Sequence, residues 1–104
     1  MIDAIKNMLG LEKTDYAQLL KDGAIILDVR SKGEYAGGHI KGSVNITLDS
    51  LQNNLNKLRD KDKTIITCCA SGMRSASAKS ILKANGYTNV HNGGGWQSLN
   101  SKLK

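Results

Sequence analysis

The sequence predicts an α/β fold in which a parallel β-sheet is flanked by helices on both faces. Two apolar runs, 24–29 and 64–68, are typical of strands that are buried on both faces. Segments with helical spacing alternate with these strands along the chain, and this alternation favours a parallel sheet. With 104 residues and no linker, repeat or low-complexity tract, we expect one domain over residues 1–104.

The chain begins with two segments of helical character. Residues 2–9 place apolar side chains at helical spacing before Gly10, and their short length and charges favour packing on the domain over a helix lying on a membrane surface. Asp15, with Gln18 three residues later, is a capping pattern that predicts a helix ending near Gly23.

A buried strand follows at 24–29, interrupted only by Asp28. In the second half, glycines mark the ends of elements because proline is absent. The later predicted elements are a helix over 49–59 with Leu51, Leu55 and Leu58 on one stripe, a strand over 64–68, a helix over 75–85 stopped by Gly86, a short strand at 88–90 and a helix after Gly95.

The composition is that of an ordinary soluble globular protein, with 39% hydrophobic and 23% charged residues. No apolar run approaches the roughly 20 residues that span a bilayer, and the N-terminus lacks a secretory signal pattern. We therefore expect a cytoplasmic protein that does not bind membranes.

Positive charge is concentrated in the second half of the sequence. Residues 1–52 hold six Lys or Arg against seven Asp or Glu, whereas residues 53–104 hold nine against two. This excess either serves only solubility or attracts an anionic ligand, and the second hypothesis predicts a reaction rate that falls with added salt. The sequence contains no known nucleic-acid-binding motif, and aromatic residues do not alternate with its basic residues, so we expect no nucleic-acid binding. The basic side chains in question are mainly Lys57, Lys61, Lys63, Lys79 and Lys83.

The two cysteines, Cys68 and Cys69, are adjacent and exclude a disulfide framework, which favours a reducing compartment. Together with His39 and His91 they make a poor zinc set, so we expect no metal. Alternation along a strand places Cys68 on the face of Ile66, away from Cys69, which favours a buried hydrophobic role over that of a resolving thiol.

Cys69 opens a small-residue segment between a predicted strand and a predicted helix. Backbone N–H groups of such a loop, the helix dipole and the guanidinium of Arg74 all favour an anion. We therefore expect the pKa of Cys69 to lie below the free value of about 8.5 and the thiolate to attack substrates that are oxyanions.

The pattern Cys69-x-x-Gly72-x-Arg74-Ser75 resembles the active-site loop of rhodaneses, the thiosulfate sulfurtransferases. An upstream stretch is similar to the signature of the same family, and so is a closing glycine pair with an aromatic residue. These matches cover most of residues 24–99. They are Asp28-Val29-Arg30, Glu34-Tyr35, Gly38-His39-Ile40, Gly42-Ser43, Asn45-Ile46 and Gly94-Gly95-Trp96.

The resemblance implies a rhodanese-like fold and a sulfurtransferase without a cofactor. Cys69 would take the outer sulfur of thiosulfate or a related donor as a persulfide and pass it to cyanide or a thiol. Arg74 would be the second catalytic residue. The partners would then be a small anionic donor and that acceptor, with a monomeric enzyme. The substrate-binding residues would be Ala70, Ser71, Gly72, Met73, Ser75 and Arg30.

Several alternatives stay open beside this reading. Arg30 would either lie near the substrate or form an internal ion pair with Asp28 or Glu34, and the ion pair is favoured. Ala70 stands where many members that act on thiosulfate carry Arg or Lys, which points toward another sulfur donor. Leu99 replaces a frequent second tryptophan, and we expect structural roles for His39 and Trp96.

Other activities are also compatible with the motif. Cysteine phosphatases and arsenate reductases share the fold, although the phosphatases have one more residue between cysteine and arginine than the six-residue span here. A dithiol redox protein would need Cys68 to take part in the chemistry. Members that act only as binding modules usually lack the cysteine.

Overall fold

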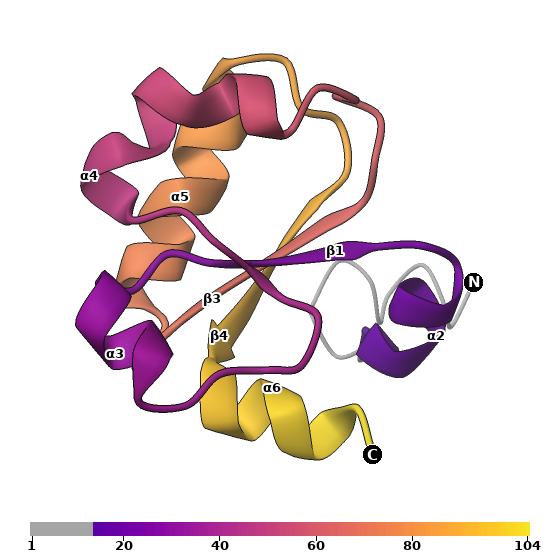
Figure 1. Ribbon diagram of the computed structural model, residues 1–104. Helices are drawn as coiled ribbons and strands as arrows, with labels where there is room; N and C mark the ends of the chain where they lie inside the picture. The colour runs from indigo at the N-terminus through magenta and orange to yellow at the C-terminus, as the bar shows by residue number, and fades with distance from the viewer. Residues whose placement is uncertain (1–13) are drawn as a thin grey trace.

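Four parallel strands form the sheet at the centre of the computed structural model, which describes residues 14–104. Their spatial order is β2-β1-β3-β4, and every pair of neighbours is parallel. Figure 1 labels the three longer strands, β1, β3 and β4. This confirms the predicted α/β class. The strands are β1 (Ile25–Asp28), β2 (Val44–Asn45), β3 (Ile65–Cys69) and β4 (Val90–Gly95).

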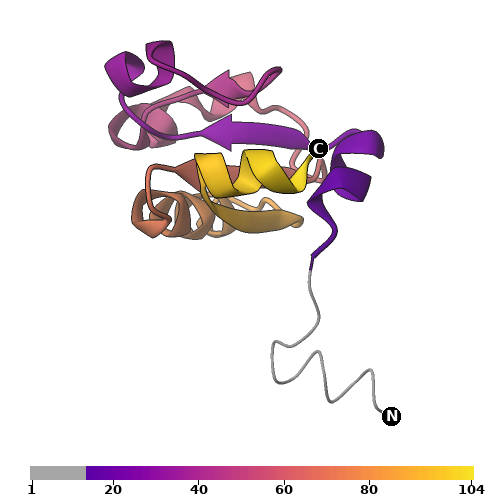
Figure 2. The ribbon, with the colours of Figure 1, turned by 90° about the horizontal axis from the view of Figure 1, so that it is seen from below.

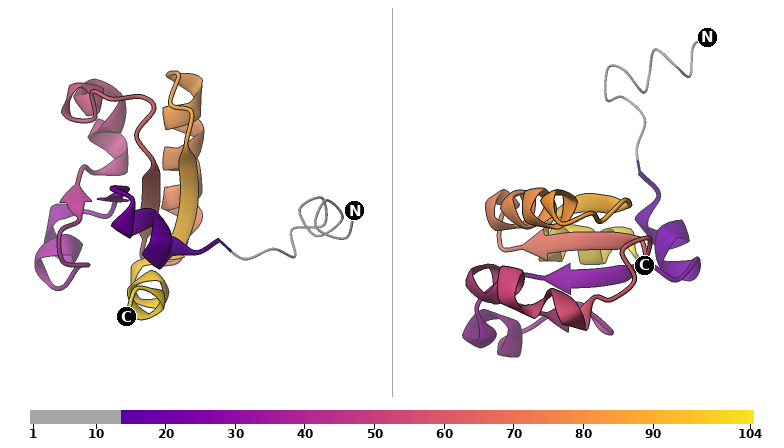
Figure 3. Two further views of the ribbon diagram at one scale, coloured as in Figure 1. Left: turned by 90° about the vertical axis from the view of Figure 1, so that its right-hand side faces the viewer. Right: turned by 90° about the horizontal axis from the view of Figure 1, so that it is seen from above.

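Helices cover both faces of the sheet, as the alternation in the sequence predicts. Seen from above, α5 and η1 lie over the strands (Figure 3), whereas the view from below brings α6 to the front (Figure 2). The first face carries α4 (Leu48–Leu51), the 3-10 helix η1 (Gln52–Lys57) and α5 (Met73–Ala84). The second face carries α2 (Tyr16–Lys21) and α6 (Trp96–Lys102), and α3 (Lys32–Ala36) follows β1.

Alternation along β3 divides its side chains between two hydrophobic clusters. Ile65 and Cys69 belong to the cluster under α4 and α5, which includes Leu27 and Leu82. Ile66 and Cys68 belong to the opposite cluster, which includes Leu99 under α6. All five residues of β3 are buried, as predicted for a strand covered on both faces.

The predicted start of α2 is confirmed in detail. The Asp15 side chain accepts a hydrogen bond from the Gln18 N–H at 3.0 Å, and the helix ends at Lys21, just before Gly23. The helix predicted for residues 2–9 lies outside the described residues.

Four predicted elements need correction. The continuous helix over 49–59 is wrong: an α-helical turn passes into a 3-10 helix, and Asn54 has non-helical angles of φ −126° and ψ 21°. The packing of its leucines nevertheless holds, because Leu51 and Leu58 are buried. The last strand runs over Val90–Gly95 instead of 88–90. Finally, β3 includes Cys69, and α5 begins earlier, at Met73.

Two elements, α3 and β2, are absent from the sequence-based prediction. The α3 helix has a capping box, in which Ser31 Oγ accepts from the Glu34 N–H and the Glu34 carboxylate accepts from the Ser31 N–H. With five and two residues, these elements are too short to produce a visible periodicity.

Within residues 14–104, no helix has the length and apolar character needed to cross a bilayer.

Candidate active site

The carboxyl ends of β1, β3 and β4 meet at one edge of the sheet, and Cys69 is the last residue of β3. Residues 69–75, called the cysteine loop below, connect this strand to the first turn of α5. Gly72 precedes α5 with a left-handed φ of +106°, a conformation that glycine adopts without strain. This turn brings the start of α5 back over the end of β3.

The Cys69 sulfur lies inside the cysteine loop and accepts backbone hydrogen bonds. The Gly72 N–H donates to Sγ at 2.9 Å and the Ser75 N–H donates at 3.3 Å. The thiol in turn donates to Ser75 Oγ at 3.4 Å. Both Cys69 and Ser75 are fully buried. The loop therefore surrounds the sulfur with donors, the arrangement predicted from the small residues at 70–72.

Two opposing effects act on the pKa of Cys69. Burial alone would raise the pKa of the thiol, but hydrogen bonds from the amides of Ser75, Gly72 and Ser71 lower it. The pKa of Cys69 is consequently lowered from its ordinary value. A larger fraction of this thiol is therefore ionised near neutral pH than of a free cysteine.

Arg74 lies on the first turn of α5, but its guanidinium is engaged by Glu34 of α3. Nη1 and Nη2 donate to the two carboxylate oxygens of Glu34 at 2.7 and 3.0 Å. This bond to Arg74, with those from Ser31, lowers the pKa of Glu34 to about 2. Both side chains are 38% exposed, so a substrate can reach the pair. The bond to Glu34 also raises the pKa of Arg74, with a smaller contribution from Cys69.

The other residues predicted to bind substrate differ in what they present. Ala70 and Ser71 are exposed, and the Ser71 amide contributes to lowering the pKa of Cys69. The Met73 side chain is 81% exposed, so this residue could serve the sulfur only through its backbone. Gly72 and Ser75 are the residues whose N–H groups bond to Sγ.

Arg30 forms an internal ion pair, which corrects its inclusion among the substrate-binding residues. It is 4% exposed, and Nη2 lies 2.7 Å from the Asp28 carboxylate, which is fully buried. Its remaining donors reach the carbonyl oxygens of Glu34 and Gly38, and its guanidinium carbon lies 4.7 Å from the centre of the Trp96 ring. These contacts brace the segment after β1 on the face opposite to the Cys69 side chain.

Cys68 and His39 have the structural placements that the sequence favours. Cys68 is buried beside Ile66, and burial raises its pKa to about 12, so it stays protonated. His39 stacks on Tyr35 with ring centres 3.8 Å apart, and its Nδ1–H donates to the Tyr35 carbonyl at 2.7 Å.

Asn92 of β4 adjoins the cysteine loop and was not singled out by the sequence. Its Oδ1 lies 2.6 Å from Ser75 Oγ and 2.9 Å from the Gly94 N. A β-bulge in β4 produces this placement. Thr67 pairs with Asn92 and Cys69 pairs with Gly95, so two steps along β3 correspond to three steps along β4. No spacing rule predicts a bulge, although the glycine run is a signal for irregular backbone.

The glycine run lets β4 approach the cysteine loop closely. A Cβ on Gly95 would lie 2.9 Å from the Ala70 carbonyl oxygen, and one on Gly93 would lie 2.8 Å from the Thr67 carbonyl oxygen. Real Cβ atoms do not come so near, so side chains here would push the strand away. This close approach is the physical reason that positions 93 and 95 of this chain require glycine.

The lysine excess is not gathered around Cys69, contrary to the steering hypothesis. Lys57, Lys61 and Lys63 come before β3, at the opposite edge of the sheet from its last residue. Lys83 belongs to the last turn of α5, whereas the first turn adjoins Cys69. Arg74, the charged residue of the cysteine loop itself, is paired with Glu34.

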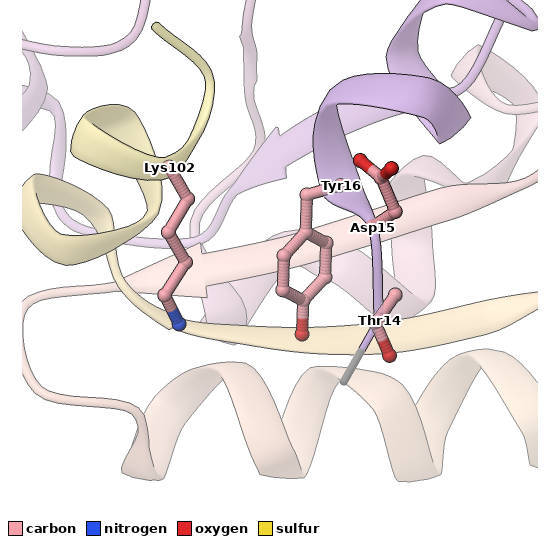
Figure 4. A pocket seen from close by; sticks show the side chains of 4 residues that line it. All are labelled: Thr14, Asp15, Tyr16 and Lys102. Carbon is pink, nitrogen blue, oxygen red and sulfur yellow. The ribbon is translucent and has the colours of Figure 1, made fainter. Parts of the chain in front are cut away.

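A pocket of about 200 Å³ adjoins the cysteine loop beside Arg74. Apart from Arg74, its walls come from the ends of β1 and β2 and from the start of α4: Val29, Ser31, Thr47, Leu48 and Asp49. A larger hollow, drawn in Figure 4, lies between α2 and α6 and is lined by Thr14, Asp15, Tyr16 and Lys102. It contains neither cysteine and borders the first described residue, so it takes no part in this site. In the described part of the chain, no three His, Cys, Asp or Glu side chains are grouped as metal ligands.

Comparisons with known proteins agree with this geometry. Residues 12–102 match the family described as Rhodanese-like domain. The Bacillus subtilis protein YqhL is 38% identical over 78% of this chain, which spans 64% of that protein. The Escherichia coli thiosulfate sulfurtransferase PspE is 35% identical, with 70% of this chain and 71% of PspE covered. A solved E. coli structure described as a rhodanese with anions has a TM-score of 0.69 and 34% identity, covering 73% of this chain and 91% of that one.

Proposed function

Because the chain belongs to the rhodanese-like domain family, we propose that it is a sulfurtransferase that carries sulfur on Cys69. The observation that carries the proposal is the position of Sγ, which accepts hydrogen bonds from the amides of Gly72 and Ser75. A sulfur atom surrounded by N–H donors is stabilised as an anion both as a thiolate and as a persulfide. Relatives named thiosulfate sulfurtransferase support the same reaction class.

The proposed reaction has two displacement steps. The Cys69 thiolate attacks the outer sulfur of thiosulfate or a related donor, a new S–S bond forms, and sulfite leaves with the electron pair of the old S–S bond. The product is a persulfide on Cys69. Cyanide or a thiolate acceptor then attacks the outer sulfur, and the Cys69 thiolate leaves with the electron pair of the persulfide bond. No external oxidant or reductant is needed.

The surrounding residues have distinct proposed roles. The amides of Ser71, Gly72 and Ser75 bind the charged sulfur, and Arg74, lining the pocket beside the loop, binds the anionic part of the donor. Glu34 holds the Arg74 guanidinium in place, so an anionic sulfur donor would share this guanidinium with the Glu34 carboxylate. Arg30 braces the segment after β1 through its bonds to Asp28, Glu34 and Gly38.

Ala70 bears on the choice of donor. Its side chain is exposed next to Cys69 and carries no charge. Arg74, already paired, is the cation left to bind thiosulfate at this edge of the loop. We therefore expect a high KM for thiosulfate and a lower one for a donor with less charge, such as an organic persulfide. The variant Ala70→Lys should lower the KM for thiosulfate about tenfold, because one added contact between charged groups is worth roughly 1.5 kcal/mol.

Thiocyanate formation from thiosulfate and cyanide tests the proposal directly. Cys69→Ser should abolish turnover, whereas the matched variant Cys68→Ala should retain it because that thiol lies in the opposite cluster. Turnover that survives in Cys69→Ser, or that disappears only in Cys68→Ala, would contradict the assignment. Hydrolysis of a phosphate monoester without sulfur transfer from any donor would favour the phosphatase alternative instead.

A further inference from the structure

The side chain of Asn92 is hydrogen-bonded to the residue that adjoins the Cys69 sulfur. Asn92 Oδ1 accepts from the Gly94 N–H at 2.9 Å and lies 2.6 Å from Ser75 Oγ. Because a backbone N–H can only donate, the Gly94 contact determines which end of the Asn92 amide faces the loop. Oδ1 can only accept, so the Ser75 hydroxyl is the donor in their short contact.

Three acceptors compete for the single hydroxyl proton of Ser75. Asn92 Oδ1 is the nearest at 2.6 Å, the Gly72 carbonyl oxygen lies at 3.0 Å, and Cys69 Sγ lies at 3.4 Å. While this proton is on the bond to Asn92, Ser75 Oγ presents lone pairs to Sγ. It can then accept the thiol proton, but it cannot donate to a thiolate.

We propose that Asn92 is a positioning residue that holds the Ser75 hydroxyl proton away from Cys69 Sγ, so that the resting thiol donates to Ser75 and the thiolate relies on the loop amides. This inference deepens the proposed function, because it takes Cys69 as the sulfur carrier. The hydrogen-bonded chain from Sγ through Ser75 to Asn92 favours the protonated sulfur, since each bond in such a chain strengthens the next.

The backbone of β4 is built for this contact. The bulge between Thr67 and Cys69 gives β4 one extra residue, and Gly94 has a left-handed φ of +80°. In that conformation the Gly94 N–H turns back to the side chain of Asn92, two residues earlier. The same glycine run brings β4 close to the cysteine loop, so the loop and the Asn92 amide are positioned together.

The chemical consequence is a more basic and more nucleophilic sulfur. Thiolate reactivity rises with the basicity of the attacking sulfur, with a Brønsted coefficient of about 0.4–0.5. By withholding one hydrogen bond from the thiolate, Asn92 keeps the sulfur reactive in a loop whose amides already favour ionisation. Releasing the Ser75 proton should therefore produce more thiolate at low pH but a less reactive one.

The test is a pH titration of the Cys69 thiolate, followed by its ultraviolet absorbance in the absence of any sulfur donor. Cys68, with its pKa raised to about 12, does not interfere. Asn92→Ala should lower the midpoint by about one pH unit, a tenfold change in the acid dissociation constant, because the freed hydroxyl then donates to the thiolate. Ser75→Ala should also lower the midpoint, but less than Asn92→Ala does, because it removes the acceptor of the thiol proton without supplying a donor to the thiolate. In the double variant the midpoint should equal that of Ser75→Ala, because Asn92 acts through Ser75.

Two further variants separate positioning from other effects. Asn89→Ala removes an asparagine just before the start of β4, whose side chain bonds to Asp62, and should leave the titration unchanged. Asn92→Asp keeps the shape and both acceptor contacts, and should raise the midpoint more in the wild-type background than in Ser75→Ala. The other charged or titratable groups on the packed elements are the same in every variant: Arg74, Lys79 and Lys83 on α5, Asp28 on β1 and His91 on β4.

A purely structural Asn92 would give a different pattern. An unchanged or raised midpoint in Asn92→Ala, or an equal shift in the Ser75→Ala background, would overturn the inference. Should Asn92→Ala fail to fold, an equal effect of Asn92→Asp in both backgrounds would overturn it as well. Since the titration uses no donor or acceptor, its outcome is independent of whether the chain transfers sulfur.

Discussion

Cys68 and Cys69 are adjacent in the sequence but differ in chemistry, because alternation along β3 points them to opposite faces of the sheet. Cys68 enters an apolar cluster, where burial raises its pKa to about 12. Cys69 meets the amides of Gly72 and Ser75, and its pKa is lowered. The local environment, rather than the residue type, therefore decides which thiol can be the nucleophile.

The Glu34–Arg74 pair gives a residue-scale prediction about pH. Because the folded protein lowers the pKa of Glu34 from 4.5 to about 2, the stabilisation from this pair is present above about pH 4.5 and is lost as the pH falls toward 2. Arg74→Ala should raise the midpoint of the Glu34 carboxyl titration, measured by NMR, toward 4.5. The bonds from Ser31 keep it somewhat below that value.

Arg59→Ala is the matched control for this titration. Arg59 is an exposed arginine between η1 and β3, outside the ion pairs of the described residues. Its removal should leave the Glu34 midpoint unchanged. A Glu34 midpoint that stays near 2 in Arg74→Ala would show that the ion pair does not form in solution.

At the scale of elements, the site depends on how closely β4 approaches the cysteine loop. Gly95→Ala would place a Cβ 2.9 Å from the Ala70 carbonyl oxygen, so the loop or the strand must move. We expect a loss of about 1–3 kcal/mol in the free energy of unfolding, typical of overpacking, and a larger loss of sulfur-transfer rate than of stability. Denaturant unfolding and turnover measured on the same preparation test both parts.

Gly33→Ala should change the stability of the protein in the opposite direction and by a similar amount. Gly33 lies within α3, and a Cβ there would meet nothing within 4 Å. This substitution should stabilise the protein by about 0.5–1 kcal/mol, because glycine is a poor helix former. Equal effects of the two glycine substitutions would refute the close-approach argument for Gly95.

The sequence predicts the long buried elements better than the short or irregular ones. The apolar runs of β1 and β3 and the spacing within α5 reflect burial, which periodicity records directly. The break at Asn54, the two-residue strand β2 and the bulge in β4 depend on tertiary contacts that leave no periodic pattern. For the same reason Cys69 and its loop amides were predictable, whereas the contact of Asn92 with Ser75 was not.

The sequence also could not predict the ion-pair partner of a residue that had two possible partners. Arg30 had either Asp28 or Glu34 available, and the chain pairs it with the carboxylate of Asp28. Glu34 bonds instead to Arg74, forty residues away in the sequence. Which acid meets which base is decided by the spatial order of the elements, here the position of α3 beside the first turn of α5.

At the scale of the whole molecule, the positive charge and the nucleophile lie at different edges of the sheet. The distance from Lys63 to Cys69 along β3 is about 20 Å at roughly 3.3 Å per residue. Because this exceeds the screening length of about 10 Å at 0.1 M salt, these lysines add little to the potential at the site. The initial rate of sulfur uptake should therefore depend only weakly on ionic strength.

Charge variants make the test of this arrangement specific. Lys61→Gln with Lys63→Gln should leave the rate and its salt dependence unchanged, whereas Arg74→Gln should lower the rate with an anionic donor. A steep fall of the wild-type rate with salt that the double lysine variant removes would restore the steering hypothesis.

The central claim is that Cys69 carries sulfur as a persulfide, and the intact mass of the protein tests it most directly. After incubation with thiosulfate or an organic persulfide, the mass should rise by one sulfur atom and return to its original value when cyanide is added. The gain should persist in Cys68→Ala and be absent in Cys69→Ser. A gain that persists in Cys69→Ser, or a wild-type protein that takes up no sulfur from any donor, would contradict the account.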